Sequence, residues 1–97
     1  MLAFFSISPL GEGESVSKPV SGIIQMIKDS GLDYQLTAMG TIIEGQPKAV
    51  FELLLACHEK MRATHPRVTS KIIIDDRGDQ MGRIRSKVAA IEKHLNL

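Results

Sequence analysis

Small hydroxyl side chains and one carboxylate are the residues of this chain whose types suggest a binding chemistry. Four hydroxyl residues and one acid lie in or at the ends of otherwise apolar, strand-like segments: Ser6, Ser8, Thr37, Thr41 and Glu44. A few hydrogen-bonding groups that converge in an apolar cavity are what a small-molecule site needs. The alternative is that the hydroxyls bond to neighbouring strands or water and that Glu44 is a solvated strand end.

A second group of charged residues is the run Asp75-Asp76-Arg77-Gly78-Asp79. Its three carboxylates suit a hard cation, but the ligand spacing of an EF-hand loop is absent. The alternative is a strand end, with Asp79 capping the next helix and Arg77 pairing with a nearby carboxylate. Asp75 remains a candidate to face a ligand.

The sequence has no pattern that indicates metal binding or catalysis. Its three histidines, His58, His65 and His94, lack the i, i+4 or paired Cys/His spacing of a zinc site. Cys57 lies on an apolar helical stripe, which favours a buried core residue over a nucleophile. A Ser-His-Asp order, a phosphate loop and a dinucleotide fingerprint are all missing from the sequence. We expect no catalytic residue, no metal and no cofactor.

Length and composition indicate one globular domain that spans residues 1–97. The net charge of +1, from 12 basic and 11 acidic residues, does not favour nucleic acid or an anionic membrane. The apolar runs are far shorter than the roughly 18 residues of a membrane span. A single cysteine fits a reducing compartment, so we expect a cytoplasmic protein.

Hydrophobic spacing and turn residues predict four strands and three helices. The first helix begins at a Ser17 N-cap and stops at Gly31, and the second begins near Pro47 and ends before His65-Pro66. The third helix places Ile84, Val88, Ile91 and Leu95 on one face. The expected strands are 2–8, 34–38, 41–44 and 68–74, with a tight hairpin turn at Met39-Gly40.

This order matches a ferredoxin-like βαββαβ sandwich, with a four-stranded antiparallel sheet and an additional C-terminal helix. We expect the helices to cover one face of the sheet. Adjacent apolar residues such as Phe4-Phe5 and Ile42-Ile43 place apolar side chains on the second face as well. We expect another copy of the sheet to cover that face, in a homodimer or homotetramer.

Several strand-end motifs, in this order along nearly the whole chain, resemble the thiamine-binding protein family. The most specific is Met39-Gly40-Thr41-Ile42-Ile43-Glu44-Gly45. The others are Ser6-Ile7-Ser8-Pro9-Leu10-Gly11, Ser15-Val16-Ser17, Ser30-Gly31-Leu32 with Tyr34, and Ile74-Asp75-Asp76-Arg77. The segment Gln35-Leu36-Thr37-Ala38 departs from the family, in which a histidine or proline is commoner before the methionine.

The resemblance implies a ferredoxin-like fold, homotetramers built from dimers whose sheets pack together, and binding of thiamine or its pyrimidine part without turnover. Thiamine carries a thiazolium cation, for which Glu44 is a candidate counter-charge, and an aminopyrimidine, to whose ring nitrogen Ser8 and Thr41 can donate. Three residues are candidates for a wall that stacks on a ring: Phe5, Tyr34 and Met39.

Two other functions remain open at this point. The chain could be an oligomeric regulatory or interaction domain that senses another small ligand, because fold alone does not choose a function. It could also be an enzyme that acts on a thiamine-like compound, with Asp75 or Glu44 as acid or base.

Overall fold

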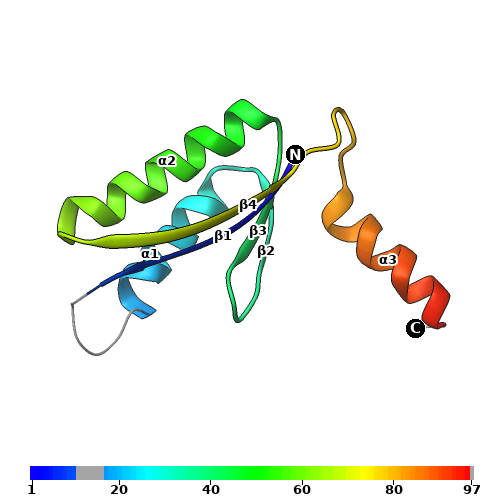
Figure 1. Cartoon of the computed structure of the whole chain (residues 1–97), viewed down its shortest axis with the longest axis horizontal. Helices are drawn as coiled ribbons and strands as arrows, with labels where there is room; N and C mark the ends of the chain where they lie inside the picture. Colours follow the sequence, from blue (N-terminus) through cyan, green and yellow to red (C-terminus); the bar gives the residue numbers. More distant parts are fainter. Residues whose placement is uncertain (11–16, 97) are drawn as a thin grey trace.

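The computed structural model describes residues 1–10 and 17–96, and it contains four strands and three helices (Figure 1). In chain order these are β1 (Leu2–Pro9), α1 (Ser17–Asp29), β2 (Asp33–Leu36), β3 (Thr41–Glu44), α2 (Pro47–Thr64), β4 (Val68–Asp75) and α3 (Arg83–Leu95). Every predicted element is present. The motif residues Gly11, Ser15 and Val16 lie outside the described residues.

The four strands form one antiparallel sheet in the order β2-β3-β1-β4, which confirms the ferredoxin-like prediction. In this arrangement β1 lies between β3 and β4, and Phe5 is opposite Thr41 on one side and Ile72 on the other. At its start, Leu2 is opposite both Glu44 and Asp75. The residues of the predicted site are therefore spread over all four strands and the turn between β2 and β3.

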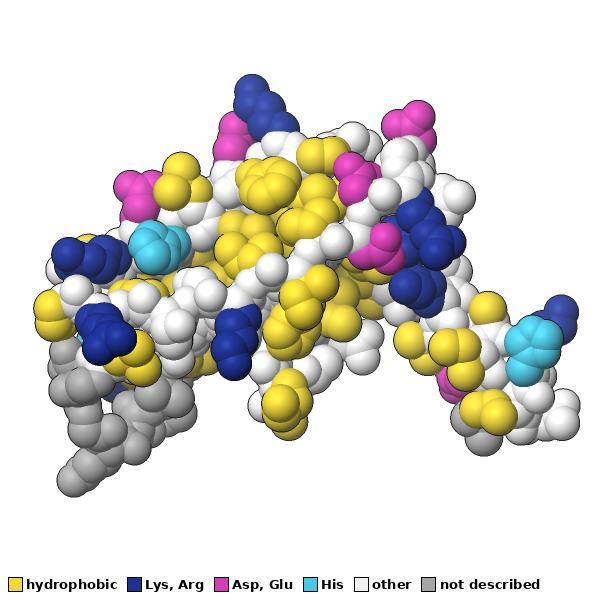
Figure 2. All heavy atoms as spheres, viewed as in Figure 1, with side chains coloured by type: hydrophobic (Ala, Val, Ile, Leu, Met, Phe, Trp, Pro, Cys, Tyr) yellow, Lys and Arg dark blue, Asp and Glu magenta, His cyan; other side chains and the backbone are white. Residues whose placement is uncertain are grey.

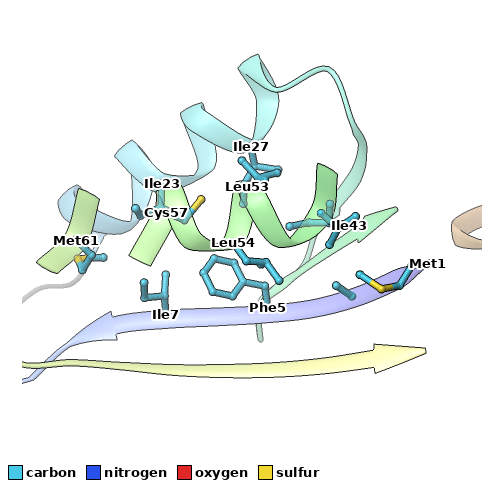
Figure 3. Packing of buried hydrophobic residues seen from close by; sticks show 12 residues of the cluster. Met1, Phe5, Ile7, Ile23, Ile27, Ile43, Leu53, Leu54, Cys57 and Met61 are labelled. Carbon is cyan, nitrogen blue, oxygen red and sulfur yellow. The ribbon is translucent and has the colours of Figure 1, made fainter. Parts of the chain in front are cut away.

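The main core lies between the sheet and the pair α1 and α2 (Figure 3). Alternate residues of β1, namely Ala3, Phe5 and Ile7, are buried toward these helices, as the two-residue period of a strand requires. α2 contributes five buried residues: Val50, Leu53, Leu54, Cys57 and Met61. All of them except Leu53 belong to the apolar stripe that the sequence predicts. α1 contributes Ile23 and Ile27.

The turn between β2 and β3 is longer than the sequence predicts, because β2 ends at Leu36 instead of Ala38. The Thr37 hydroxyl accepts hydrogen bonds from the backbone N–H groups of Met39 and Gly40, each at 3.2 Å, and donates to the Gly40 carbonyl at 2.7 Å. A threonine side chain that bonds to nearby backbone replaces strand pairing with a turn. The chain therefore reverses over residues 37–40 and not over Met39-Gly40 alone.

The third helix does not join the other two, so the prediction that the helices share one face is wrong for α3. It packs against β3, and Ile84 is buried there. Glu44 is opposite Leu2 and Asp33, whose side chains point away from α1 and α2, so α3 lies on the second face. The prediction that Asp79 caps this helix is also wrong, since the N-cap residue is Gly82 and no side chain of the loop caps it.

The second face of the sheet, which we call the open face, is only partly covered by α3. Leu2, Phe4 and Ile42 are half-buried there, whereas Ile73 is 65% exposed. Beyond Ile84, three large apolar residues of α3 are more than half exposed: Val88, Ile91 and Leu95. Val88 and Ile91 line a groove between α3 and the open face. Apolar side chains on both faces were predicted, and the structure leaves a substantial part of them exposed.

Candidate functional site

A cavity of about 220 Å³, which we call the hairpin pocket, lies where the β2–β3 turn meets β1 and α1. Five of the predicted site residues line it: Phe5, Ser6, Thr37, Met39 and Thr41. The rest of its wall is Ile7 from β1, Val20, Ile23 and Ile24 from α1, and Leu36, Ala38 and Gly40 from the hairpin. No charged side chain is among these lining residues, so the pocket is an apolar hollow with a few hydroxyl groups.

Thr41 is the most deeply placed polar residue of the pocket wall. It is only 2% exposed, and it is opposite Phe5 at the start of β3. Because Thr41 lines the cavity, its hydroxyl group is placed to form a hydrogen bond with a ligand there.

Thr37 and Gly40 shape the pocket. The Thr37 hydroxyl donates one hydrogen bond and accepts two within the turn, so it stabilises the turn. Gly40 lies against β1, where an added Cβ atom would be 2.6 Å from Cζ of Phe4 and 2.9 Å from the carbonyl oxygen of Phe5. Only glycine allows this close approach, which holds the turn against the strand. Met39 is 81% exposed and forms the lip of the pocket.

Two other predicted residues, Ser8 and Tyr34, do not line the hairpin pocket. Ser8 lies on the open face of β1, where it is opposite Thr69 of β4. Tyr34 is opposite Ile43 in β2 and packs against the main core, between the sheet and its helices. The pocket and these two side chains are therefore separate features of the sheet.

Glu44 and Asp75 lie at the far end of β1 from the pocket. Both are opposite Leu2, three residues before Phe5, which is about 10 Å along a strand. Glu44 is 2% exposed, and its carboxylate accepts the backbone N–H groups of Arg83 at 3.0 Å and Ile84 at 3.4 Å. Glu44, at the end of β3, therefore caps the N-terminus of α3. Its carboxylate is not solvated, and it does not line the hairpin pocket.

Asp75 belongs to the same end of the molecule. Its carboxylate accepts a hydrogen bond from the guanidinium of Arg83 at 2.5 Å and lies 3.5 Å from Nζ of Lys87. The hydrogen bond from Arg83, and then the positive charges of Arg83 and Lys87, lower the pKa of Asp75 below its ordinary value. Arg83 is 3% exposed, and its Nε atom has no partner among the described residues.

The prediction that Arg77 pairs with a carboxylate is not met within residues 1–10 and 17–96, where Asp75 pairs with Arg83 and Lys87 instead. A further ion pair holds α3 to β2, between Arg85 and Asp33 at 2.6 Å. Asp33 raises the pKa of Arg85 above its ordinary value. Asp75 and Asp33 therefore hold α3 against the sheet through three of its basic side chains.

The wall that α1 provides to the pocket was not predicted as part of a site. It consists of Val20, Ile23 and Ile24, which are apolar residues at helical spacing in the sequence. Their spacing predicts burial, but which sheet residues they oppose depends on how α1 packs. Arg83, the buried partner of Asp75, was missed because an arginine in a charged sequence gives no sign of burial.

Two further features of the described residues concern metal-ligating side chains and helices that could span a membrane. In residues 1–10 and 17–96, no three His, Cys, Asp or Glu side chains come together as a metal site would need. Among the same residues, no helix is both long and apolar enough to cross a bilayer. The thiol of Cys57 is fully buried, and desolvation raises its pKa to about 11.

The chain is similar to proteins from distant bacteria and archaea. It is 42% identical over 96 residues to a UPF0045 protein of Staphylococcus xylosus, a match that covers 93% of this chain and 90% of the relative. It is 38% identical over 96 residues to a UPF0045 protein of Mycobacterium tuberculosis, with 98% and 94% of the two chains covered.

Solved structures share the fold. A crystal structure from the archaeon Methanocaldococcus jannaschii superposes with a TM-score of 0.86 at 36% identity, over 95% of each chain. A Thermotoga maritima protein has the same fold at 17% identity, with a TM-score of 0.76 over 90% of this chain and 96% of that one. Residues 3–92 also match the family model described as thiamine-binding protein. Because this match extends from β1 into α3, the chain belongs to the thiamine-binding protein family.

Proposed function

We propose that this chain binds thiamine or a related pyrimidine compound in the hairpin pocket and does not turn it over. The observation that carries the proposal is an apolar cavity whose wall contains the hydroxyl residue Thr41, which is 2% exposed. Membership of the thiamine-binding protein family supports the class of ligand. The pocket is also formed by residues of the Met39–Gly45 and Ser6–Gly11 motifs that carry the family resemblance.

The size and charge of the pocket favour the pyrimidine ring as the part of thiamine that enters. Pockets that enclose a whole drug-sized ligand measure about 300–1,000 Å³. A cavity of about 220 Å³ suits a single ring. None of its described lining residues is charged, so it suits the neutral aminopyrimidine better than the thiazolium cation. We propose that the thiazolium ring stays outside the lip formed by Met39, where a neighbouring copy can contact it.

Each proposed contact follows from the position of one side chain. Thr41 donates its hydroxyl proton to a ring nitrogen of the pyrimidine, and Phe5 provides an apolar wall beside it. The Met39 sulfur lies at the entrance, where a thioether against an aromatic ring contributes about 0.3–1.5 kcal/mol. Thr37 and Gly40 keep the turn in the shape that forms the cavity.

Self-association and the absence of turnover belong to the same proposal. Exposed apolar side chains on the open face and on α3, such as Ile73 and Ile91, support association with further copies of the chain. The lining residues that the structure describes include no carboxylate, histidine or cysteine, which supports binding without acid, base or nucleophilic catalysis. We propose that the protein acts in the cytoplasm, where its single cysteine remains a thiol.

The experiment is isothermal titration calorimetry with thiamine, with its aminopyrimidine half and with its thiazole half, on the wild-type chain and on Thr41→Val. Valine keeps the shape of threonine and removes the hydroxyl group. A hydrogen bond contributes about 0.5–1.5 kcal/mol net, so affinity for the pyrimidine half should fall about 2- to 13-fold.

A matched control is Ser8→Ala, which removes a hydroxyl from the same strand as Phe5 but outside the pocket. We expect this variant to bind like the wild type. Equal losses in both variants, or no loss in Thr41→Val, would place the ligand elsewhere on the sheet. Mass spectrometry of thiamine after long incubation tests the absence of turnover, and any converted product overturns that part of the proposal.

A further inference from the structure

A second cavity lies beside a different face of α1, between the start of this helix and the end of α2. Its volume is about 590 Å³, compared with about 220 Å³ for the hairpin pocket. Among the described residues, Ile23 alone lines both. We call this second hollow the helix cavity, and the function proposed above does not use it.

The described lining of the helix cavity contains three basic side chains and no acidic one. Lys18 comes from the first turn of α1, whereas Lys60 and His65 come from the end of α2 and the residue after it. This end of α2 is basic in sequence as well, since residues 60–67 include four Lys, Arg or His residues and neither Asp nor Glu. Figure 2 shows Lys and Arg side chains at the end of the molecule where α2 ends. The charge of the cavity therefore suits an anion.

The two lysines approach the cavity from different helices. Neither forms an ion pair with a described residue. The stem of Lys60 lies over α1, with its Cε atom 3.5 Å from the position that a Cβ atom on Gly22 would take. Lys18 lies near the positive end of the α1 dipole, where a cation is unfavourable. An anion between the two ammonium groups would replace this repulsion with attraction.

His65 adds a third group, and its hydrogen bond defines which ring nitrogen a ligand can use. Its Nδ1 atom lies 3.1 Å from the carbonyl oxygen of Met61. A carbonyl oxygen only accepts, so Nδ1 carries the hydrogen and donates it. The hydroxyl oxygen of Thr64, at 3.0 Å, can accept from the same hydrogen. The Nε2 atom is then left for a ligand, as an acceptor when neutral and as a donor when protonated.

A phosphate monoester matches these three groups. It carries a charge of about −1.5 to −2 at pH 7, which suits two lysines better than the single charge of a carboxylate. Its second pKa is about 6, so it either donates a hydroxyl proton to Nε2 of His65 or accepts one from it. Its three oxygen atoms can accept hydrogen bonds from Lys18 and Lys60 at the same time.

The remaining wall leaves room for an organic group attached to the phosphate. Pockets that enclose organic ligands measure about 300–1,000 Å³, and the helix cavity lies within this range. The rest of its described lining is mainly apolar and includes Pro19, Met61 and Ala63. Apolar side chains of this kind favour a ring or an alkyl group over water.

We propose that the helix cavity binds a small organic phosphate monoester. The phosphate lies between Lys18, Lys60 and His65, and the organic group lies against the apolar wall. The site is separate from the hairpin pocket, whose hydroxyl and aromatic residues it does not include. Failure of pyrimidine binding would therefore leave this proposal standing.

The test is an NMR titration of the ¹⁵N-labelled chain with phenyl phosphate, inorganic phosphate and phenol. Phenyl phosphate should shift the amide signals of Gly22, Thr64 and His65 to saturation. Inorganic phosphate should need about a 10-fold higher concentration, because it lacks the apolar group. Phenol should not shift these signals to saturation in the same range. The absence of a saturable shift with phenyl phosphate overturns the proposal, and equal affinity for inorganic phosphate overturns its organic part.

A pair of lysine variants tests whether the cavity or overall charge attracts the anion. Lys60→Gln removes the ammonium group and keeps the stem over Gly22, so affinity for phenyl phosphate should fall about 5- to 15-fold. The matched control is Lys48→Gln, at the other end of α2 and about 18 Å along the helix, which should bind like the wild type. Equal affinities of the two variants overturn the site. The aminopyrimidine half of thiamine should bind equally to Lys60→Gln and to the wild type, so failures of the two cavities give different results.

Discussion

Replacing Glu44 separates two roles for the same carboxylate. The sequence suggests a counter-charge for a bound cation, whereas the structure gives Glu44 two backbone N–H donors at the start of α3. The prediction is that Glu44→Gln loosens α3 and leaves affinity for thiamine unchanged. Glutamine has nearly the same shape, so the change removes the charge and one acceptor with little effect on packing.

The expected magnitude follows from burial and geometry. A hydrogen bond to a charged group contributes about 1.5–3 kcal/mol, and the loss of an N-cap costs about 0.5–2 kcal/mol. Glutamine keeps one acceptor oxygen, and the second bond is long at 3.4 Å. We therefore expect Glu44→Gln to lower the free energy of unfolding by about 1–2 kcal/mol. Glu44→Ala should cost about 2–4 kcal/mol, because both N–H groups lose their partner and a void remains.

Two measurements detect this loss. If α3 unfolds together with the core, calorimetry should show a midpoint lowered by about 5–15 °C for Glu44→Gln. If α3 detaches locally, the core midpoint stays and the amides of Arg83 and Ile84 exchange faster with deuterium. The matched control is Asp33→Asn, which removes an exposed contact to α3 through Arg85 and should change stability by less than about 1 kcal/mol.

Ligand titration of Glu44→Gln completes the experiment. Unchanged thiamine affinity with weakened protection of α3 is the expected result. The capping role of Glu44 is refuted if the affinity falls strongly while the α3 amides and the thermal midpoint remain as in the wild type. That result would mean that the carboxylate serves the ligand and that its contacts with α3 contribute little.

Two further substitutions test the pocket and the charge cluster. Gly40→Ala places a Cβ atom 2.6 Å from the Phe4 ring, so we expect about 1–3 kcal/mol of destabilisation in urea unfolding and weaker binding of the pyrimidine half. Gly22→Ala is the matched control: its Cβ would meet only Lys60 at 3.5 Å, inside a helix where alanine is favoured, and a loss of similar size there would remove the steric explanation. Asp75 has a lowered pKa in the folded chain, so its contribution to stability is present above the ordinary aspartate pKa of about 4 and is lost as the pH falls through the lowered value. Asp75→Asn should therefore flatten the acid side of a plot of thermal midpoint against pH, and a variant that follows the wild-type curve would show that the contacts with Arg83 and Lys87 do not stabilise the fold.

The order of strands and helices was predictable because it depends on local patterns. The period of apolar residues identified α2, and Pro47 and Gly31 marked where helices begin and end. The end of β2 was misplaced because Thr37 is compatible with a strand by type. Its hydroxyl bonds to Met39 and Gly40, and this preference for a turn becomes visible only when the backbone geometry is known.

Part of the pocket was predictable for a related reason. Thr37 and Thr41 were predicted as hydroxyl residues in otherwise apolar strand segments, and Phe5 as an aromatic wall. Residues of neighbouring strands lie close together when the register places them opposite each other, as it does for Phe5 and Thr41. The apolar wall from α1 was not identified as part of a site, since a helical stripe predicts that Ile23 is buried but not which residues it faces. The strand and turn residues of the pocket could therefore be predicted in part from the sequence, whereas the α1 residues could be assigned to it only from the packing of the helix.

Glu44 is the case in which residue type and local sequence point to the wrong partner. A carboxylate at a strand end is ordinarily solvated, and a buried carboxylate is uncommon unless it has donors. Here the donors come from Arg83 and Ile84, 39 and 40 residues later. One local clue existed: Gly82, just before α3, has no side-chain oxygen with which to cap the helix. Because helix starts leave backbone N–H groups without partners, a helix without a local cap requires an acceptor from elsewhere, and a strand-end acid on the same face can supply it.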